Sequence, residues 1–176
     1  MFRLSFRFVY DDLELIKTMT EKQFDQYFGD ISGQIELHCG GETVGFYHEE
    51  VPFGNELILL WFKRLNEVVF LLKTHNYIAM NVIENNNWIE FIKEDDSLRL
   101  NFVEGPDLSK INGFITNTPI NSSEKREWGE VKISYDGFLK EINQKTNELL
   151  EMIKQINIKL LEADIVTRIL NMKNHI

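Results

Sequence analysis

The chain has 176 residues but contains one cysteine, three prolines and no long unbroken hydrophobic run. Its single cysteine, Cys39, excludes an intramolecular disulfide, so the core alone must hold the fold. The most apolar segment, residues 57–72, is interrupted by Lys63, Arg64, Asn66 and Glu67. It does not predict a membrane span, because charged side chains are costly in lipid. The first residues alternate apolar and polar types, unlike a signal peptide, and we expect a cytoplasmic protein.

Positive charge is also scarce. The chain has 19 Lys and Arg residues against 28 Asp and Glu residues, which gives a formal net charge of −9. Nucleic acids and anionic membranes are bound mainly through Lys and Arg, so this balance argues against either as a partner. It favours a basic protein partner, although solubility alone explains the acidity equally well.

Hydrophobic residues are plentiful by contrast, at 43% of the chain with 13 phenylalanines. This composition suffices for one core, and we expect a single domain over residues 1–176. Alternation of apolar and polar residues over residues 2–8 predicts a half-buried strand. The run Thr20-Glu21-Lys22-Gln23 has the spacing of a capping box, which predicts a short helix ending at Gly29.

A β-hairpin is predicted around Gly40-Gly41, because two adjacent glycines suit a two-residue turn. The register set by this turn places four apolar residues on one face: Ile35, Leu37, Val44 and Phe46. Residues 57–73 are apolar around most of a helical circumference and predict a buried central helix, with Asn66 on its narrow polar side.

Shorter strands are predicted in the second half of the chain at residues 77–84, 88–93, 98–103, 111–115 and 130–134. The first three are joined by turns rich in Asn and Asp, as in an antiparallel meander. Residues 104–126 carry the weakest pattern, with Gly, Pro and a polar run.

The C-terminal residues 137–174 are predicted to be helical, with Asp136 as the N-cap. Apolar residues recur in heptads from residue 142 to 170, which fits one helix or two helices joined near Asn157 or Asp164. We expect this segment to pack on the chain's own sheet. The alternative is that it packs on a second copy of the chain in a homodimer. The expected fold class is α+β: a mostly antiparallel sheet, formed by hairpin and meander, packed by the buried central helix and the C-terminal helix or helix pair.

No cluster of residues demands a particular chemistry, and we predict no catalytic residue, metal site or cofactor. His38, Cys39 and His48 are residue types that bind zinc, but the hairpin register puts the two histidines on opposite faces. A nucleophilic Cys39 would need a base beside it, so a structural cysteine is the expected role. The segment Gly40-Gly41 lacks the lysine of a phosphate-binding loop.

Adjacent carboxylates occur in predicted turns at Asp11-Asp12, Glu49-Glu50 and Asp95-Asp96. Such pairs are usually only solvated, although paired acids also serve glycoside chemistry or bind Mg²⁺. Acidic side chains steer a basic partner toward its site. The residues expected to contact a partner protein are Glu49, Glu50, Asp95 and Asp96.

The order of the predicted strands and helices resembles that of a known group of proteins. A Phe-rich strand is followed by the run Phe28-Gly29-Asp30-Ile31-Ser32, the Gly-Gly hairpin, an apolar helix beginning Asn55-Glu56-Leu57, a meander and a helical tail. In size, acidity and this order, the chain resembles the small bacterial proteins that include the immunity proteins of polymorphic toxin systems. The resemblance implies a catalytically inert protein that binds a cognate, often basic, toxin.

We therefore expect a non-enzymatic, cytosolic protein-binding module, with an immunity protein that neutralises a basic toxin as its specific form. The alternative is a small-ligand-binding protein or an enzyme whose pocket lies between the central helix and the sheet. In that alternative, Trp61, Trp88 and Trp128 would line the pocket.

Overall fold

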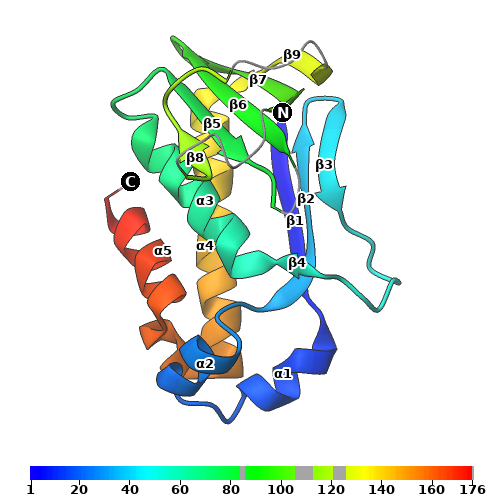
Figure 1. Cartoon of the computed structure of the whole chain (residues 1–176), viewed down its shortest axis with the longest axis vertical. Coiled ribbons are helices and arrows are strands. Elements are labelled where there is room, and N and C mark those ends of the chain that lie inside the picture. Colours follow the sequence, from blue (N-terminus) through cyan, green and yellow to red (C-terminus); the bar gives the residue numbers. More distant parts are fainter. Residues whose placement is uncertain (84–85, 106–112, 121–125, 176) are drawn as a thin grey trace.

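The computed structural model describes residues 1–83, 86–105, 113–120 and 126–175, apart from the side chains of residues 10–12 and 126–127. Over these residues the fold is α+β with a helical C-terminal part, as the sequence predicts (Figure 1). The predicted hairpin and meander do not share one sheet, however, but belong to two separate antiparallel sheets. None of the helices in these ranges combines the length and apolar character needed to cross a membrane.

The first sheet contains β1 (Phe2–Phe8), β2 (Ser32–Cys39), β3 (Glu42–Phe46) and the short β4 (Glu56–Leu57). Strand β2 lies between β1 and β3, and β4 continues the β3 side of the sheet by pairing with Ser32 and Gly33. The predicted hairpin register is confirmed, because Leu37 pairs with Val44 and Ile35 pairs with Phe46. Phe46 stands at the end of its strand and is exposed, unlike the other three.

The second sheet has the strand order β8-β5-β6-β7-β9. Its strands are β5 (Tyr77–Asn81), β6 (Asn87–Glu94), β7 (Ser97–Glu104), β8 (Ile115–Thr116) and β9 (Arg126–Ser134). The meander of β5, β6 and β7 is confirmed, and Asp95 in the β6–β7 turn takes a positive φ of 51°. A short edge strand also forms, at β8, while residues 111–112 of the predicted strand lie outside the described residues.

Two short helices connect β1 to β2, α1 (Tyr10–Ile16) and α2 (Glu21–Tyr27). The capping box is confirmed, since Thr20 Oγ1 accepts from the Gln23 amide at 3.3 Å and the Thr20 amide donates back to Gln23 Oε1 at 2.9 Å. Helix α1 was not predicted, because its N-cap, Val9, makes no side-chain hydrogen bond that a sequence pattern could reveal.

The predicted central helix is α3 (Ile58–Leu71), which begins without a capping side chain of its own. Asp30 supplies the cap from the segment before β2: its Oδ1 accepts from the Leu59 amide and its Oδ2 from the Leu60 amide, both at 2.8 Å. Its Oδ1 also accepts from the Ile31 amide at 2.7 Å. Burial raises the pKa of Asp30 to about 6, while these amide donors act in the opposite direction.

The C-terminal segment is a helix pair, α4 (Tyr135–Ile156) and α5 (Asp164–Asn174), joined by a 3₁₀ turn (Ile158–Glu162). Of the two arrangements that the sequence left open, one helix or two, the second forms, and the junction spans both candidate positions, Asn157 and Asp164. The predicted N-cap was wrong, however: Ser134 Oγ accepts from the Gly137 amide at 3.1 Å, and Asp136 lies inside the first turn. There its carboxylate interacts favourably with the helix dipole.

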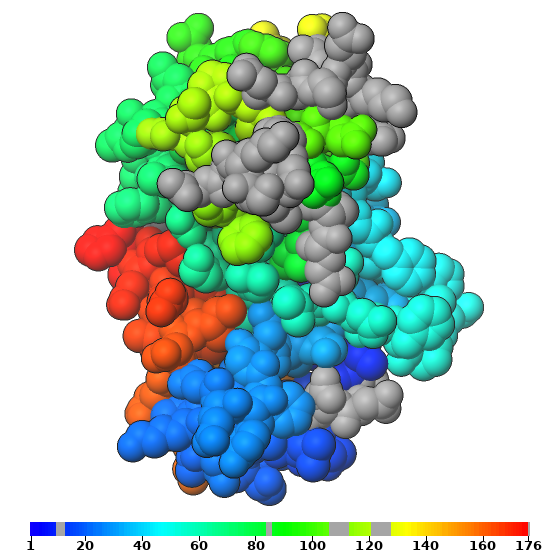
Figure 2. Space-filling view, viewed as in Figure 1, coloured from blue at the N-terminus to red at the C-terminus, as the bar shows by residue number. Residues whose placement is uncertain are grey.

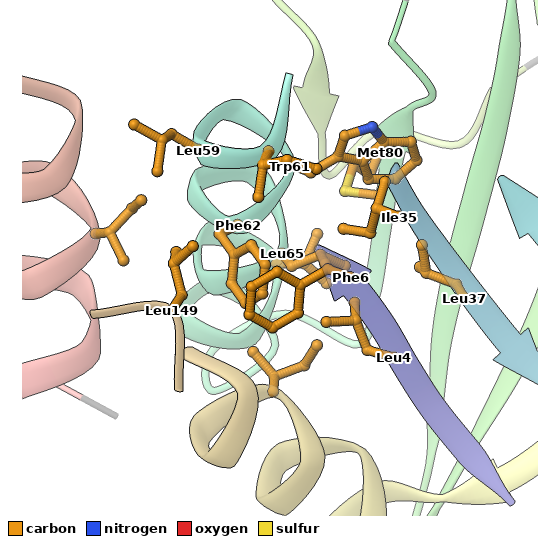
Figure 3. Close-up of a cluster of buried hydrophobic side chains, with 14 of the residues drawn as sticks. Leu4, Phe6, Ile35, Leu37, Leu59, Trp61, Phe62, Leu65, Met80 and Leu149 are labelled. Atoms are coloured by element: carbon orange, nitrogen blue, oxygen red, sulfur yellow. The ribbon is translucent and has the colours of Figure 1, made fainter. Parts of the chain in front are cut away.

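The main core gathers side chains from both sheets and from α3, α4 and α5. Figure 3 shows Phe62 and Leu65 of α3 facing Leu4 and Phe6 of β1, with Leu149 of α4 beside them. The rings of Phe6 and Phe62 meet edge to face, with their centroids 4.8 Å apart. Helices α4 and α5 therefore pack within the chain, as favoured above. The rest of the chain covers the buried heptad residues Ile142, Leu149 and Ile153 of α4 and Leu160 of the 3₁₀ turn.

The sequence places Asn66 on a polar side of the central helix, and this prediction was wrong. Asn66 is fully buried, and its Nδ2 donates to the Phe62 carbonyl at 2.8 Å and to Thr146 Oγ1 at 3.0 Å. Thr146 of α4, also fully buried, donates in turn to the Ile142 carbonyl at 2.7 Å. A polar contact between α3 and α4 thus explains why threonine occupies a heptad position.

Candidate functional site

The hairpin residues considered for metal or nucleophilic chemistry do not converge. Cys39 is buried in the main core, and burial raises the pKa of its thiol to about 12, so the reactive thiolate is suppressed. His38 lies on the other side of β2, with its Nε2 2.8 Å from Glu36 Oε1. His48 lies beyond the end of β3, although the sequence predicts it within that strand. In the described part of the chain, no three His, Cys, Asp or Glu side chains are grouped to hold a metal ion.

A buried carboxylate, Glu90, is another catalytic candidate, but both its oxygens are occupied. The Tyr77 hydroxyl donates to Oε1 at 2.7 Å, and Asn101 Nδ2 donates to Oε2 at 2.9 Å. Tyr77 accepts from the Ile120 amide at 3.0 Å, and Asn101 Oδ1 accepts from the Glu130 amide at 2.8 Å. The network therefore fastens the backbone at Ile120 onto the second sheet and joins β9 to β7 within that sheet. Burial, followed by the bond to Glu90, raises the pKa of Tyr77.

The two acidic pairs expected to contact a partner are exposed but lie apart. The Asp96 carbonyl accepts from the Tyr135 amide at 3.0 Å, so the β6–β7 turn lies at the start of α4. The start of α4 is also where Phe138 meets Phe2, at the beginning of β1. The Glu49 carbonyl instead accepts from Arg7. Arg7 follows Phe2 by five residues in β1, and at the rise of an extended strand this separates the two residues by roughly 16 Å. Glu49-Glu50 and Asp95-Asp96 thus do not form one patch. The side chains of Asp11 and Asp12 are outside the described residues.

Between β3 and β4, residues 47–55, hereafter the 47–55 loop, stand out from the body of the molecule (Figures 1 and 2, cyan). The loop contains no helix or strand, yet its main chain is held by a single buried side chain, Gln34, which is 1% exposed. Gln34 Nε2 donates to the carbonyls of Val51 at 3.1 Å and Phe53 at 2.6 Å. Its Oε1 accepts from the His48 amide at 2.9 Å.

Arg7 of β1 completes the attachment of the 47–55 loop. Its Nε donates to Gln34 Oε1 at 3.1 Å, its Nη1 donates to the Glu49 carbonyl at 2.6 Å, and its Nη2 donates to the Val51 carbonyl. Each nitrogen of the guanidinium therefore has an acceptor. Gln34 is buried and Arg7 is half-buried, so their bonds to Val51, Phe53 and His48 would be costly to leave unmade, whereas the bond to the Glu49 carbonyl is exposed and contributes less.

The loop also rests directly on β2. A Cβ atom at Gly54 would lie 2.3 Å from the Gly33 carbonyl oxygen, so only glycine permits this close approach. The loop main chain is thus fixed both by this backbone contact and by the side chains of Gln34 and Arg7. What it presents outward is apolar and acidic: Phe53 is 68% exposed, and Glu49 and Glu50 are exposed.

Sequence reasoning selected Glu49 and Glu50 but missed the residues that hold the main chain of their loop. Gln34 and Arg7 occur in strands as ordinary polar residues, and their loop partners lie 14 to 44 residues away in sequence. Phe53 follows a proline in a short run without periodicity, which marks it only as loop. The one available signal was an apolar ring between Pro52 and Gly54, since turns usually carry small or polar residues.

The alternative site, lined by three tryptophans, does not form. Trp61 is buried in the main core with its Nε1 donating to Glu56 Oε2 at 2.7 Å. Trp88 belongs to a second, smaller cluster with Ala79 and Val103. Trp128 packs against Phe102 with ring centroids 5.7 Å apart. These tryptophans therefore contribute to packing at separate places.

The geometry of the 47–55 loop is the best-defined surface feature that could contact another molecule. The resemblance to immunity proteins covers only size, acidity and the order of elements. No protein-family model matches the chain, and no curated protein or solved structure matches it.

Proposed function

We propose that this chain is a non-enzymatic protein-binding module of the cytosol, with the 47–55 loop as its contact surface for a basic protein. The observation that carries the proposal is the combination of a 68% exposed Phe53 with a main chain fixed by Gln34 and Arg7. Loops of this length are commonly mobile, and a mobile loop loses conformational entropy when it binds. A loop already fixed avoids most of that cost.

Phe53 supports the proposal through its size. Interfaces depend on a few large side chains, often aromatic, which bury apolar area in a pocket of the partner. An exposed phenylalanine offers this area at the low entropic cost of two side-chain torsions. Phe46, which is exposed at the end of β3 just before the loop, enlarges the apolar surface.

Charge supports a basic partner. The 47–55 loop carries Glu49 and Glu50 and has no lysine or arginine, within a chain of net charge −9. Complementary charge accelerates association and fixes orientation more than it adds affinity. A basic partner would therefore approach this surface quickly at low salt and more slowly at high salt.

The specific form we favour is an immunity protein that neutralises a basic toxin. Such a protein needs no chemistry of its own, because covering the partner's surface is sufficient. The burial of Cys39 and the full occupancy of the Glu90 oxygens are consistent with a chain whose polar groups serve structure.

The test is affinity capture from the native host at low and high salt, with matched variants. Phe53→Ser removes the proposed anchor, whereas Tyr27→Ser removes an equally exposed aromatic (68%) on α2. We expect the wild type and Tyr27→Ser to retain one basic protein at low salt, and Phe53→Ser to lose it. Recovery of no protein at low salt, or equal recovery with Phe53→Ser, would contradict the proposal.

A further inference from the structure

A second feature, independent of the 47–55 loop, is the environment of Arg64 on α3. This arginine is only 4% exposed, and its Nη1 donates to the Asn81 carbonyl at 2.7 Å, its one hydrogen bond to the residues that the structure describes. The ring of Phe114 covers one face of the guanidinium, with 4.4 Å between Cζ and the ring centroid. The buried Nε has no hydrogen-bond partner among the described residues.

The positive charge of Arg64 also has no carboxylate in contact with it in the described part of the chain. Glu67, the nearest acid on the same helix face, pairs with Lys63 at 3.2 Å. Burial lowers the pKa of Arg64 to about 10, although Glu67 acts in the opposite direction. A buried cation that lacks a counter-charge is energetically unfavourable, and an anion beside it would relieve this cost.

Arg64 lines a hollow of about 250 Å³ between α3 and the segment that leads into β8. Its other walls include Leu60, Lys63, Glu67, Phe114 and Ile115. Figure 2 shows the yellow-green segment around β8 lying over the green helix α3. The hollow therefore lies between the central helix and the second sheet, where the sequence placed the alternative ligand site. In place of tryptophans it is lined by two cations, by Glu67, which is paired with Lys63, and by apolar side chains that include Phe114.

We propose that this hollow binds a small oxyanion, a carboxylate or a phosphate group, with the guanidinium of Arg64 as the main ligand and Lys63 as a second cation. One edge of the guanidinium is committed to the Asn81 carbonyl. The Nε edge is the side of the fork that holds two oxygens of a carboxylate or phosphate in parallel hydrogen bonds. A point charge cannot reproduce this geometry, so lysine would be a poor substitute at the same position.

The first experiment follows the Nε–H signal of Arg64 by ¹H–¹⁵N NMR in the intact protein. Inorganic phosphate and succinate are titrated separately, with sodium chloride at matched ionic strength as the reference. We expect the Arg64 signal to shift saturably with at least one of the two oxyanions. The Nε–H of Arg168, an exposed arginine on α5, serves as the control and should follow ionic strength only.

Two variants separate a specific site from general stabilisation by salts. Arg64→Lys keeps the charge but loses the fork, and we expect at least a roughly tenfold weaker affinity, since each bidentate pair contributes about that factor or more. Lys63→Gln, at a half-buried position that does not threaten folding, should weaken binding about threefold. Lys22→Gln on α2 is its matched control and should leave the affinity unchanged.

The outcomes are decisive even if Arg64→Lys fails to fold, because the wild-type titration and Lys63→Gln remain. Saturation by phosphate alone assigns a phosphate-bearing ligand, and saturation by succinate alone assigns a carboxylate. If neither anion shifts Arg64 more than Arg168, or if Lys63→Gln binds as tightly as Lys22→Gln, the proposal is wrong. Neither result bears on the 47–55 loop, which lies on other elements.

Discussion

The β2–β3 hairpin and the 47–55 loop follow each other in the chain but are held in different ways. The hairpin is fixed by an apolar face, on which Ile35, Leu37 and Val44 are buried in strand pairs. The loop is fixed by polar side chains, Gln34 and Arg7, that reach its main chain from two strands. Apolar packing thus builds the scaffold, while a few buried hydrogen bonds shape what the scaffold presents.

The largest effect on the free energy of unfolding is expected from a change in the apolar face of the hairpin. Leu37→Ala removes a fully buried side chain and leaves a cavity, which should lower the free energy of unfolding by about 2 to 5 kcal/mol. Urea unfolding followed by circular dichroism measures this change. Leu15→Ala on α1, where the leucine is exposed, is the control and should change stability little. Equal effects of the two variants would refute the assigned burial.

The cap that Asp30 provides to α3 is a polar anchor whose effect should depend on pH. Its pKa is raised in the folded state from 3.8 to about 6, so its contribution is present at low pH and is lost as pH rises through 6. Between pH 4 and pH 7 the wild type should lose about 2 to 3 kcal/mol of stability relative to Asp30→Asn, which does not titrate.

The measurement is urea unfolding of the wild type, Asp30→Asn and Asp95→Asn across this pH range. Asp95 is exposed at a positive φ that asparagine also tolerates, so its variant should follow the wild type. A constant difference between the wild type and Asp30→Asn at every pH would show that Asp30 does not titrate as described.

Gln34→Ala tests the polar attachment of the 47–55 loop. It removes the bonds to Val51, Phe53 and His48, so we expect a loss of about 1 to 3 kcal/mol. Exchange of the His48 amide hydrogen should accelerate at least tenfold, while the Leu37 amide in β2 keeps its protection relative to global stability. The exposed Gln26→Ala on α2 should change neither. Unchanged exchange at His48 would mean that the loop is held by other contacts.

Phe53→Ser should have the smallest effect on folding. The ring is mostly exposed, so we expect stability to change by no more than about 0.5 kcal/mol, although the partner is lost. Thermal unfolding measures the first quantity and affinity capture the second. A large drop in the unfolding midpoint would indicate that Phe53 serves the fold, which would remove the main argument for a binding surface.

The same comparison explains how much of the molecule could be predicted from its sequence. The hairpin register, the Thr20 capping box and the meander depend on residues close together in the chain, and each was predicted. Asn157 and Asp164 were recognised as candidate junctions for the same reason, although one unbroken helix was left open as well. Local patterns determine these features because the interacting groups are neighbours in sequence.

The features that sequence reasoning missed depend on distant partners. Asn66 is polar by type, yet it is buried because Thr146, 80 residues later, satisfies it. Gln34 and Arg7 look like ordinary strand residues until the 47–55 loop is placed beside them. The acidic pairs were recognised, but their separation follows from how α4 packs on β1, which no local pattern encodes. The candidate site was therefore only partly predictable, through Glu49 and Glu50.

The most direct test of the account compares the two exposed acidic pairs. Glu49→Gln with Glu50→Gln, and Asp95→Asn with Asp96→Asn, each remove two negative charges from the same net charge of −9. The measured quantity is the association rate with the captured basic protein at low salt. We predict a fall of about threefold to tenfold for the loop pair and little change for the turn pair. Equal falls for both pairs, or a larger fall for Asp95 and Asp96, would contradict the 47–55 loop as the contact surface.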